Sequence, residues 1–467
     1  MRGKRVLGFC IVLLVLAGLA VPAGAAPAET DRLAELERQV KALKAEVAAW
    51  KEAARSAEPG SPVAAEAASD RIAEIERRIE VLASEIERLK LGEAAAEADR
   101  SQYGMGPAAS KIYRTGQGLS IGGYGEMVYQ SFDSRRDDGA PSGATDQLDF
   151  LRGVVYFGYK FSDCFLLNSE IEYEHASTGE GGEVSVEFAY LDYLWRPEAN
   201  LRAGLLLLPM GFLNELHEPT VYLGAKRPDV ERVILPTTWR ENGFGLWGDV
   251  GPLSYRTYVV NGFDGSGFAS SGLRGGRQKG AQAKAEDFAW VGRLDYSGAP
   301  GLLVGASAYV GDSGQGLRAA GGEISVATTI LEGHLEWRWK DFQARALLVK
   351  AELDDVAALN AVLGLAGNRS VGEELSGWYL EAGYDLLAHR TASERQLIPY
   401  ARFEAFDTQE GVPAGFLRDP ARDVESLTLG LAFKPIDRWI VKLDYQDYDN
   451  GAGTGVDQIN VALGYVF

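Results

Sequence analysis

The sequence contains few of the residues that build disulfide networks and metal sites. Its 467 residues include two cysteines and four histidines. Cys10 lies in a segment that we expect to be removed, which leaves Cys164 without an internal disulfide partner. After that segment, no window reaches the unbroken apolar length of a membrane-spanning helix. The mature chain is therefore expected to be soluble, or to enter a membrane as strands.

Positive charge is also scarce, with 47 Lys and Arg against 66 Asp and Glu, a formal net charge of −19. This balance argues against a nucleic-acid partner, because neutralising phosphates requires a basic surface. Glu215, His217 and Glu218 are neighbours, but they do not form an H-E-x-x-H motif and no second histidine follows to complete a metal site. We expect no catalytic residue, no metal and no cofactor, and therefore no enzyme.

The N-terminus has the layout of a secretory signal. Three basic residues precede an apolar run over residues 10–19, and Ala-Gly-Ala at residues 23–25 offers a cleavage site. We predict a signal peptide over residues 1–25. The alternative is an uncleaved anchor, although the apolar run is short for a membrane span.

Residues 26–102 are predicted to form a periplasmic coiled-coil segment. Apolar residues recur there at alternating spacings of three and four, which is the seam of a coiled coil. Two prolines and a glycine within residues 58–62 must end the first helix. Association between chains and a self-folding helical hairpin both remain open, as do a dimer and a trimer. The seam residues are Leu33, Leu36, Val40, Leu43, Val47 and Trp50, then Ile72, Ile75, Ile79, Leu82, Ile86 and Leu89.

After a linker over residues 103–118, the heptads give way to two-residue alternation, most clearly at the C-terminus. Apolar residues alternate there with polar or small ones, which suits lipid on one side of a strand and water on the other. We expect Tyr465 and Phe467 of this strand to serve membrane assembly. The apolar positions are Ile459, Val461, Leu463, Tyr465 and Phe467.

Residues 119–467 are predicted to form a transmembrane antiparallel β-barrel of about sixteen strands, an all-β fold. Short turns alternate with long loops through the whole region, which a soluble sandwich has no reason to maintain. Aromatic residues near the strand ends fit a girdle at the lipid headgroups. The expected strands are 120–132, 147–160, 165–175, 184–195, 201–209, 242–249, 253–261, 286–296, 302–311, 323–339, 342–352, 374–386, 396–407, 424–434, 438–448 and 457–467.

The connection from Met210 to Glu241 is the longest in the barrel region, and we expect it to fold inward and narrow the lumen. Its basic residues either line an anion path or pair with nearby acids to brace the loop. Those loop candidates are Lys226, Arg227, Arg232 and Arg240. The candidates on the lumen wall, taken from the alternation, are Arg152, Lys160, Arg202, Arg256, Arg293, Arg338, Arg345 and Arg402.

Several short motifs lie between residues 148 and 262: Asp149-Phe150-Leu151-Arg152, Gly158-Tyr159-Lys160-Phe161, Glu187-Phe188-Ala189-Tyr190, Asn200-Leu201-Arg202-Ala203-Gly204 and Glu231-Arg232. With them the chain resembles the phosphate-selective porin family of the O and P type. The resemblance implies a homotrimer of sixteen-stranded pores with an inward third loop and a basic path for anions. Arg152, Lys160, Arg202 and Arg232 match motif positions, while the acidic residues of the loop depart from the pattern.

We therefore predict a porin of the Gram-negative outer membrane, with its helices in the periplasm. It is expected to let small hydrophilic solutes diffuse passively and to favour anions such as phosphate. The expected partners are membrane lipids, further copies in a homotrimer, the barrel-assembly machinery through the C-terminal strand, and small inorganic or organic anions. The alternatives are a general or sugar-type pore, a structural envelope tether anchored by its barrel, and a barrel hydrolase.

Overall fold

The computed structural model describes residues 27–56, 74–75, 77–79, 82, 103–179, 181–319, 321–388 and 395–467. The chain divides into two compact units, one of Met1–Asp99 with Arg338–Asp341 and one of Arg100–Trp337 with Phe342–Phe467. The predicted signal peptide and the predicted helix break at residues 58–62 lie outside the described residues. Among the residues described, no helix is both long and apolar enough to cross a membrane.

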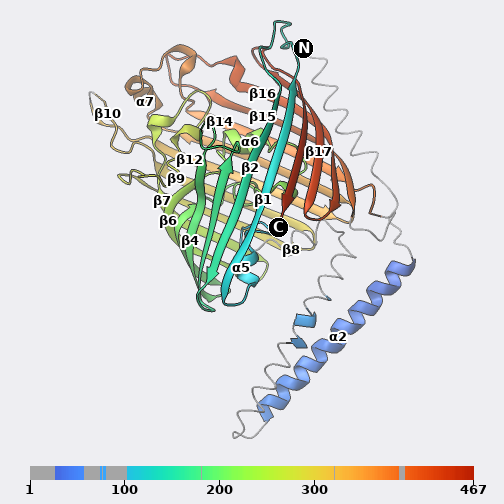
Figure 1. The fold of residues 1–467 in the computed structure, drawn as a ribbon. Helices are drawn as coiled ribbons and strands as arrows, with labels where there is room; N and C mark the ends of the chain where they lie inside the picture. The colour runs from blue at the N-terminus through green and yellow to red at the C-terminus, as the bar shows by residue number, and fades with distance from the viewer. Residues whose placement is uncertain are drawn as a thin grey trace. The chain divides into compact units, whose positions relative to one another are not determined.

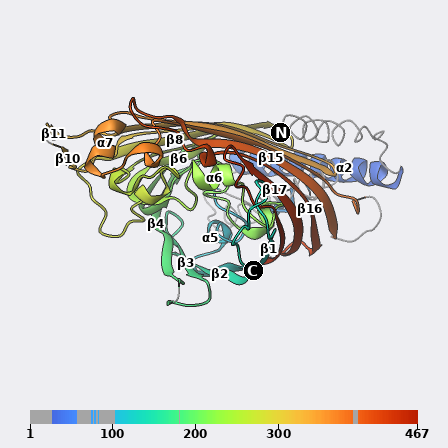
Figure 2. The ribbon, with the colours of Figure 1, turned by 90° about the horizontal axis from the view of Figure 1, so that it is seen from above.

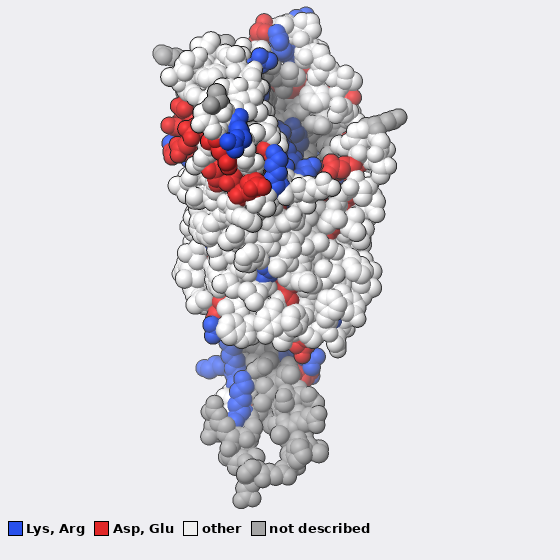
Figure 3. All heavy atoms as spheres, turned by 90° about the vertical axis from the view of Figure 1, so that its left-hand side faces the viewer, with Lys and Arg blue, Asp and Glu red and all other residues white. Residues whose placement is uncertain are grey.

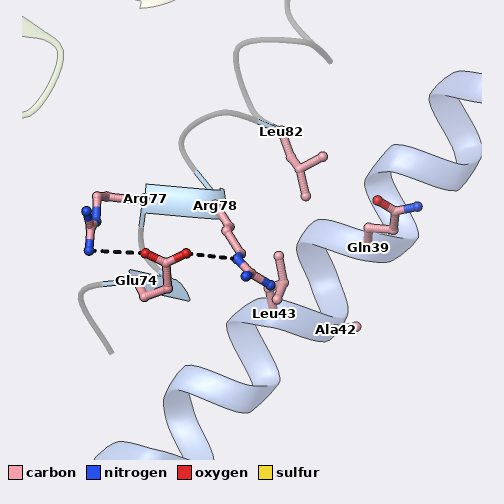
Figure 4. Close-up of a pocket in the computed structure, with 7 residues that line it drawn as sticks. All are labelled: Gln39, Ala42, Leu43, Glu74, Arg77, Arg78 and Leu82. Atoms are coloured by element: carbon pink, nitrogen blue, oxygen red, sulfur yellow. Dashed lines mark hydrogen bonds and ion pairs between the residues drawn. The ribbon is translucent and has the colours of Figure 1, made fainter. Parts of the chain in front are cut away.

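The first unit contains the helix α2, Pro27–Ser56, and helical residues between 74 and 82. Val47 of α2 and Ile75 are both buried. A groove runs between α2 and the later residues (Figure 4), and the carboxylate of Glu74 pairs there with Arg78 at 3.2 Å. Two helical stretches of one chain thus lie side by side, as in a hairpin. Association between chains stays a prediction. The groove is lined by Gln39, Ala42, Leu43, Glu74, Arg77, Arg78 and Leu82.

The second unit is a closed antiparallel barrel of sixteen strands (Figure 1), which confirms the predicted fold class. Each strand pairs with its neighbours in sequence, and the last strand pairs with the first to close the ring. The strands are β1 (Gly118–Phe132), β2 (Gln147–Lys160), β3 (Phe165–Glu174), β4 (Val184–Arg196), β5 (Ala199–Leu207), β6 (Arg240–Val250), β7 (Leu253–Asn261), β8 (Phe288–Ala299), β9 (Leu302–Asp312), β12 (Ala327–Trp339), β13 (Phe342–Leu353), β14 (Glu374–Tyr384), β15 (Gln396–Gly411), β16 (Asp423–Ile436), β17 (Trp439–Asn450) and β18 (Gln458–Val466).

One strand begins later than predicted. The strand expected over residues 323–339 starts at Ala327, and the residues before it form a separate hairpin of β10 (Arg318–Ala319) and β11 (Gly322–Glu323). The reason is local, because the carboxylate of Asp312 accepts hydrogen bonds from the backbone N–H groups of Gly314 at 2.9 Å and Val326 at 2.8 Å. These bonds close residues 313–326 into a loop. The other boundaries agree within a few residues.

The strands alternate between an apolar outer face and a polar inner face. In β17, Trp439, Val441, Leu443 and Tyr445 are exposed, whereas the residues between them, Lys442 among them, are buried. A broad band of the outer surface carries few charged side chains, and charge gathers above it at the loop end (Figure 3). A closed ring leaves no unpaired backbone edge, so this surface is compatible with hydrocarbon. Outward-exposed aromatics near strand ends include Trp195, Trp290, Trp337, Trp339, Trp439, Tyr159, Phe161 and Tyr296.

Gly204 is expected to be essential for pairing between β4 and β5. Its φ is +140°, and a Cβ at this position would lie 2.3 Å from the carbonyl oxygen of Ala189 and 2.8 Å from the Cα of Tyr190. Because both contacts are backbone atoms, Gly204→Ala should lower the free energy of unfolding by about 2 kcal/mol or more. Urea unfolding in detergent measures the loss. Gly116→Ala, where a Cβ would meet nothing within 4 Å, is the control, and equal stability of the two variants would contradict the prediction.

Candidate functional site: the barrel interior

The loop between β5 and β6, residues 208–239, lies inside the barrel, and we call it the inner loop. It contains the turn η1 (Pro219–Val221) and the short helix α6 (Asp229–Val233). In the view onto the barrel end, α6 lies within the outline of the strands (Figure 2). η1 packs against β1, β17 and β18, and α6 packs against β14 and β15. The loop leaves one side of the wall and reaches the opposite side, so it narrows the lumen.

Charged side chains of the wall hold the backbone of the inner loop. Lys442 Nζ donates to the carbonyl oxygen of Gly224 at 2.9 Å, and the N–H of Ala225 donates to the carboxylate of Asp444 at 2.7 Å. Arg402 Nη1 donates to the carbonyl oxygen of Lys226 at 3.2 Å. A loop bonded in this way to several strands is a fixed constriction, because moving it would leave buried charges without partners.

Side chains of the loop bind the wall in return. The imidazole of His217 lies 3.1 Å from the carboxylate of Glu170, and the hydroxyl of Tyr222 donates to Glu126 at 2.5 Å. The carboxylate of Glu215 lies 3.0 Å from the guanidinium of Arg256. Burial raises the pKa of Glu215, and the nearby Arg256 opposes this rise. The neighbours Glu215 and His217 are thus engaged in bracing the loop. No group of three or more described His, Cys, Asp or Glu residues is placed to hold a metal.

The predicted wall arginines face the lumen, and most have a carboxylate partner. Burying a guanidinium is costly unless an acid compensates its charge, and the barrel supplies one to each of the six arginines paired below. The role of these residues as an anion path stays a prediction. The pairs are Arg152 with Glu172 (3.1 Å), Arg202 with Asp192 (2.8 Å), Arg256 with Asp295 (2.5 Å), Arg293 with Asp295 (2.8 Å), Arg345 with Glu336, and Arg402 with Glu404 (3.2 Å).

Two wall candidates lie at strand ends. Lys160, at the end of β2, is half-buried, and its Nζ lies 3.4 Å from the carbonyl oxygen of Thr115. Arg338, near the end of β12, is also half-buried. Their position places them near the short-turn end of the barrel.

The four predicted loop residues differ in environment. Arg240 is buried and pairs with Glu187 at 2.7 Å. Arg232 is half exposed and pairs with Asp229 at 2.6 Å. Lys226 is half-buried, and its charge helps to lower the pKa of Asp229 against the opposing effect of burial. Arg227 donates to the carbonyl oxygen of His217 at 3.2 Å. Of the four residues, Arg232 and Arg240 form ion pairs with acids, and Lys226 lies near Asp229. Arg227 donates to a backbone carbonyl oxygen.

A second loop, residues 262–287, also reaches across the barrel, and sequence analysis missed it. It contains η2 (Gly265–Gly267) and η3 (Arg274–Gly276). Its Ser270 carbonyl accepts a bond from Thr408 of β15 at 2.6 Å, and we call it the bridging loop. Arg277 donates to the carbonyl oxygens of Pro236 at 3.0 Å and Thr238 at 2.7 Å. In the sequence, the feature that could have indicated this loop is a pair of arginines within a glycine-rich run. Glycine allows two backbones to approach closely.

Arg227, Arg274 and Arg277 form what we call the basic cluster. Arg274 donates to the carbonyl oxygen of Thr237, so all three guanidiniums bond to backbone carbonyls. Among the described residues, none of the three has a carboxylate at ion-pair distance, unlike the wall arginines. The pKa of Arg274 is lowered, chiefly by burial and further by the nearby guanidiniums of Arg277, Arg232 and Arg227. Within the described part of the chain, the cluster therefore carries positive charge that no ion pair neutralises directly, and a bound anion would do so.

Residues 103–117, predicted as a linker, pack inside the barrel, and we call them the plug. They include the short helix α5 (Lys111–Arg114), which lies within the strand outline in Figure 2. Met105, Ala108 and Ile112 are buried with side chains of the inner wall. The plug contacts the first residues of β1 and the last of β2, so it lies near the short-turn end.

The C-terminal residues complete the ring. The main chain of Phe467 exchanges hydrogen bonds with Gly123 of β1, at 2.9 Å and 3.1 Å. The phenol of Tyr465 lies over Gly125, where a Cβ would be only 2.4 Å from its hydroxyl oxygen. Both residues thus take part in closing β18 on β1, while their role in membrane assembly stays a prediction.

Known structures with similar folds include several proteins of bacterial outer membranes. The outer membrane channel DcaP of Acinetobacter baumannii is 12% identical and covers 75% of this chain and 97% of its own, with a TM-score of 0.49. The Salmonella typhi OmpF complex with daunomycin is 13% identical, covers 76% and 99%, and has a TM-score of 0.47. OmpT of Vibrio cholerae, an outer membrane protein, is 11% identical, covers 75% and 97%, and has a TM-score of 0.46.

Sequence comparison identifies a relative. No protein-family model matches the chain. An uncharacterized protein of Aquifex aeolicus (strain VF5) is 37% identical over 374 residues, which cover 77% of this chain and 83% of that protein. Identity at this level over most of both chains shows common descent, and the chain belongs to the same family as the Aquifex aeolicus protein.

Proposed function

We propose that the protein is a porin of the Gram-negative outer membrane, through which small hydrophilic solutes diffuse passively with a preference for anions such as phosphate. The barrel supports this proposal because it is closed, apolar outside and lined by polar side chains. The preference for anions rests on one observation, the basic cluster. The wall arginines pair with acids, whereas Arg227, Arg274 and Arg277 have no carboxylate at ion-pair distance among the residues that the structure describes.

The wider assignments belong to the same proposal. Membership of the phosphate-selective porin type rests on the motifs around Arg152, Lys160, Arg202 and Arg232. A homotrimer in contact with membrane lipids, helices in the periplasm, and recognition of the C-terminal strand by the assembly machinery follow from that type and from the predicted heptads. The second candidate is a pore without charge preference, which the compensated charges of the wall favour.

Reversal potentials separate the two candidates. The purified protein is placed in a planar bilayer under a potassium chloride gradient at low salt. If anions permeate faster than cations, the reversal potential should have the sign of the chloride equilibrium potential. Adding phosphate should reduce chloride current, because both anions would occupy the same cluster. A value near zero supports the pore without charge preference, and the absence of any conductance overturns the porin proposal.

A further inference from the structure

The plug is bound along one side of the lumen, by neighbouring strands of the wall. At one end, the ring centroids of Tyr103 and Trp247 of β6 are 4.5 Å apart. At the other end, Asn168 of β3 donates to the carbonyl oxygen of Ala109 at 3.0 Å. A Cβ at Gly158 of β2 would lie 3.0 Å from the Cβ of Ile112. The segment before the first strand therefore fills part of the lumen next to the short turns.

The carboxylate of Glu218, in the inner loop, holds the plug by hydrogen bonds. Glu218, which is buried, accepts hydrogen bonds from the backbone N–H of Ala108 at 3.0 Å and of Ala109 at 3.1 Å. A Cβ at Gly106 would lie 2.5 Å from Glu218 Oε1, so the plug backbone lies directly against this carboxylate. The contact joins two segments that both narrow the lumen, and neither belongs to the strand ladder.

From this geometry we infer that residues 103–117 are a gate, latched to the inner loop by Glu218, whose release widens the solute path at the short-turn end. The inference rests on the proposed function, because a gate requires a conducting lumen. The ring closes through pairs between β1 and β18 that begin at Tyr124, and those between β1 and β2 begin at Gly118. Since the plug precedes all of these residues, it can leave without breaking a strand pair.

The latch should respond to pH. Burial raises the pKa of Glu218 to about 7 against the opposing backbone hydrogen bonds. The groups facing it are His217 beside it, Glu170 of β3, Tyr156 of β2 and the plug's own N–H groups. A released carboxyl would return to a lower, ordinary pKa, so the docked plug binds the proton more tightly. Docking is therefore favoured at low pH and weakens as pH rises through about 7.

A reversible disulfide tests the gate. Ile112→Cys with Gly158→Cys, in a Cys164→Ser background, places the two Cβ atoms near disulfide distance. The oxidised protein should have a small single-channel conductance that does not change between pH 6 and pH 8. After reduction with dithiothreitol, the conductance at pH 8 should rise severalfold. Equal conductance in the oxidised and reduced states at pH 8 overturns the gate and leaves the porin intact. No conductance in either state overturns the porin proposal instead.

A substitution tests the latch itself. Glu218→Gln keeps an acceptor for the plug but has no proton to lose, so its conductance should remain small from pH 6 to pH 8. Glu410→Gln makes the same chemical change at an exposed position and should keep the pH response of the unmodified protein. Heat-modifiable migration in gel electrophoresis reports that each barrel is folded. A normal pH response in folded Glu218→Gln would contradict the latch.

Discussion

Replacing Arg227, Arg274 and Arg277 together by glutamine is expected to lower the anion-to-cation permeability ratio by about tenfold or more at low salt. A guanidinium about 6 Å from a passing ion contributes about 0.7 kcal/mol at the dielectric constant of water. Three such charges sum to about 2 kcal/mol. Reversal potentials in a salt gradient measure the ratio. The effect should fade towards about 1 M salt, where the screening length falls to about 3 Å.

A charge-matched variant controls for net charge. Arg135 and Arg136 lie in the connection between β1 and β2, Arg318 lies in the exposed hairpin of β10 and β11, and their replacement by glutamine removes the same number of charges. This variant should retain most of the permeability ratio. An equal loss in both variants would show that overall charge, rather than the basic cluster, sets the preference. An unchanged ratio in the cluster variant would remove the evidence for an anion path.

The strands could be predicted because their determinants are local. A barrel strand separates lipid from water along its whole length. Adjacent residues such as Val441 and Lys442 of β17 therefore lie on opposite faces, and their polarity shows which face is which. The late start of β12 could not be predicted, because it depends on the carboxylate of Asp312, which binds the backbone of residues 314 and 326. Such capping of a loop by a side chain leaves no periodic signal.

The interior was only partly predictable, because pairing across the lumen joins residues that are far apart in sequence. Alternation predicted an inward position for Arg402, but it could not show that Glu404 and the carbonyl oxygen of Lys226 would both bind it. Of the loop residues chosen from sequence, Arg227 has no carboxylate at ion-pair distance in the described part of the chain. Its companions, Arg274 and Arg277, come from the bridging loop, whose inward course depends on contacts with the inner loop and β15.

The interior therefore contains two kinds of arginine, which have different consequences when removed. Arginines such as Arg402 neutralise buried acids and hold the inner loop, so their loss should affect stability first. Those of the basic cluster bond to neutral carbonyl oxygens, so their loss leaves no buried charge without its counter-ion. Their loss should affect selectivity first. Sequence position alone does not separate these kinds, since both occur at inward positions.

Arg402→Ala is accordingly expected to lower the free energy of unfolding by about 3–5 kcal/mol, since it leaves two buried carboxylates unpaired. Those acids are Glu404, 3.2 Å away, and Glu381, 3.5 Å away, and the side chain of Arg402 is only 1% exposed. The substitution also removes the bond to the carbonyl oxygen of Lys226 that holds the inner loop at β15. We therefore expect a lower urea midpoint in detergent and larger current fluctuations in a planar bilayer.

Arg418→Ala supplies the matched comparison, because Arg418 also pairs with an acid, Asp407, but has a side chain that is 51% exposed. Solvent screens the exposed guanidinium, and Asp407 keeps its hydrogen bond from the backbone N–H of Gln409 at 2.7 Å, so this change should cost less than Arg402→Ala, about 1 kcal/mol. Because Arg418 does not bind the inner loop, the current through this variant should fluctuate no more than the current through the unmodified protein. If the two variants unfold at the same urea concentration, the buried pairs do not brace the constriction, and the fixed geometry attributed to the inner loop would be wrong.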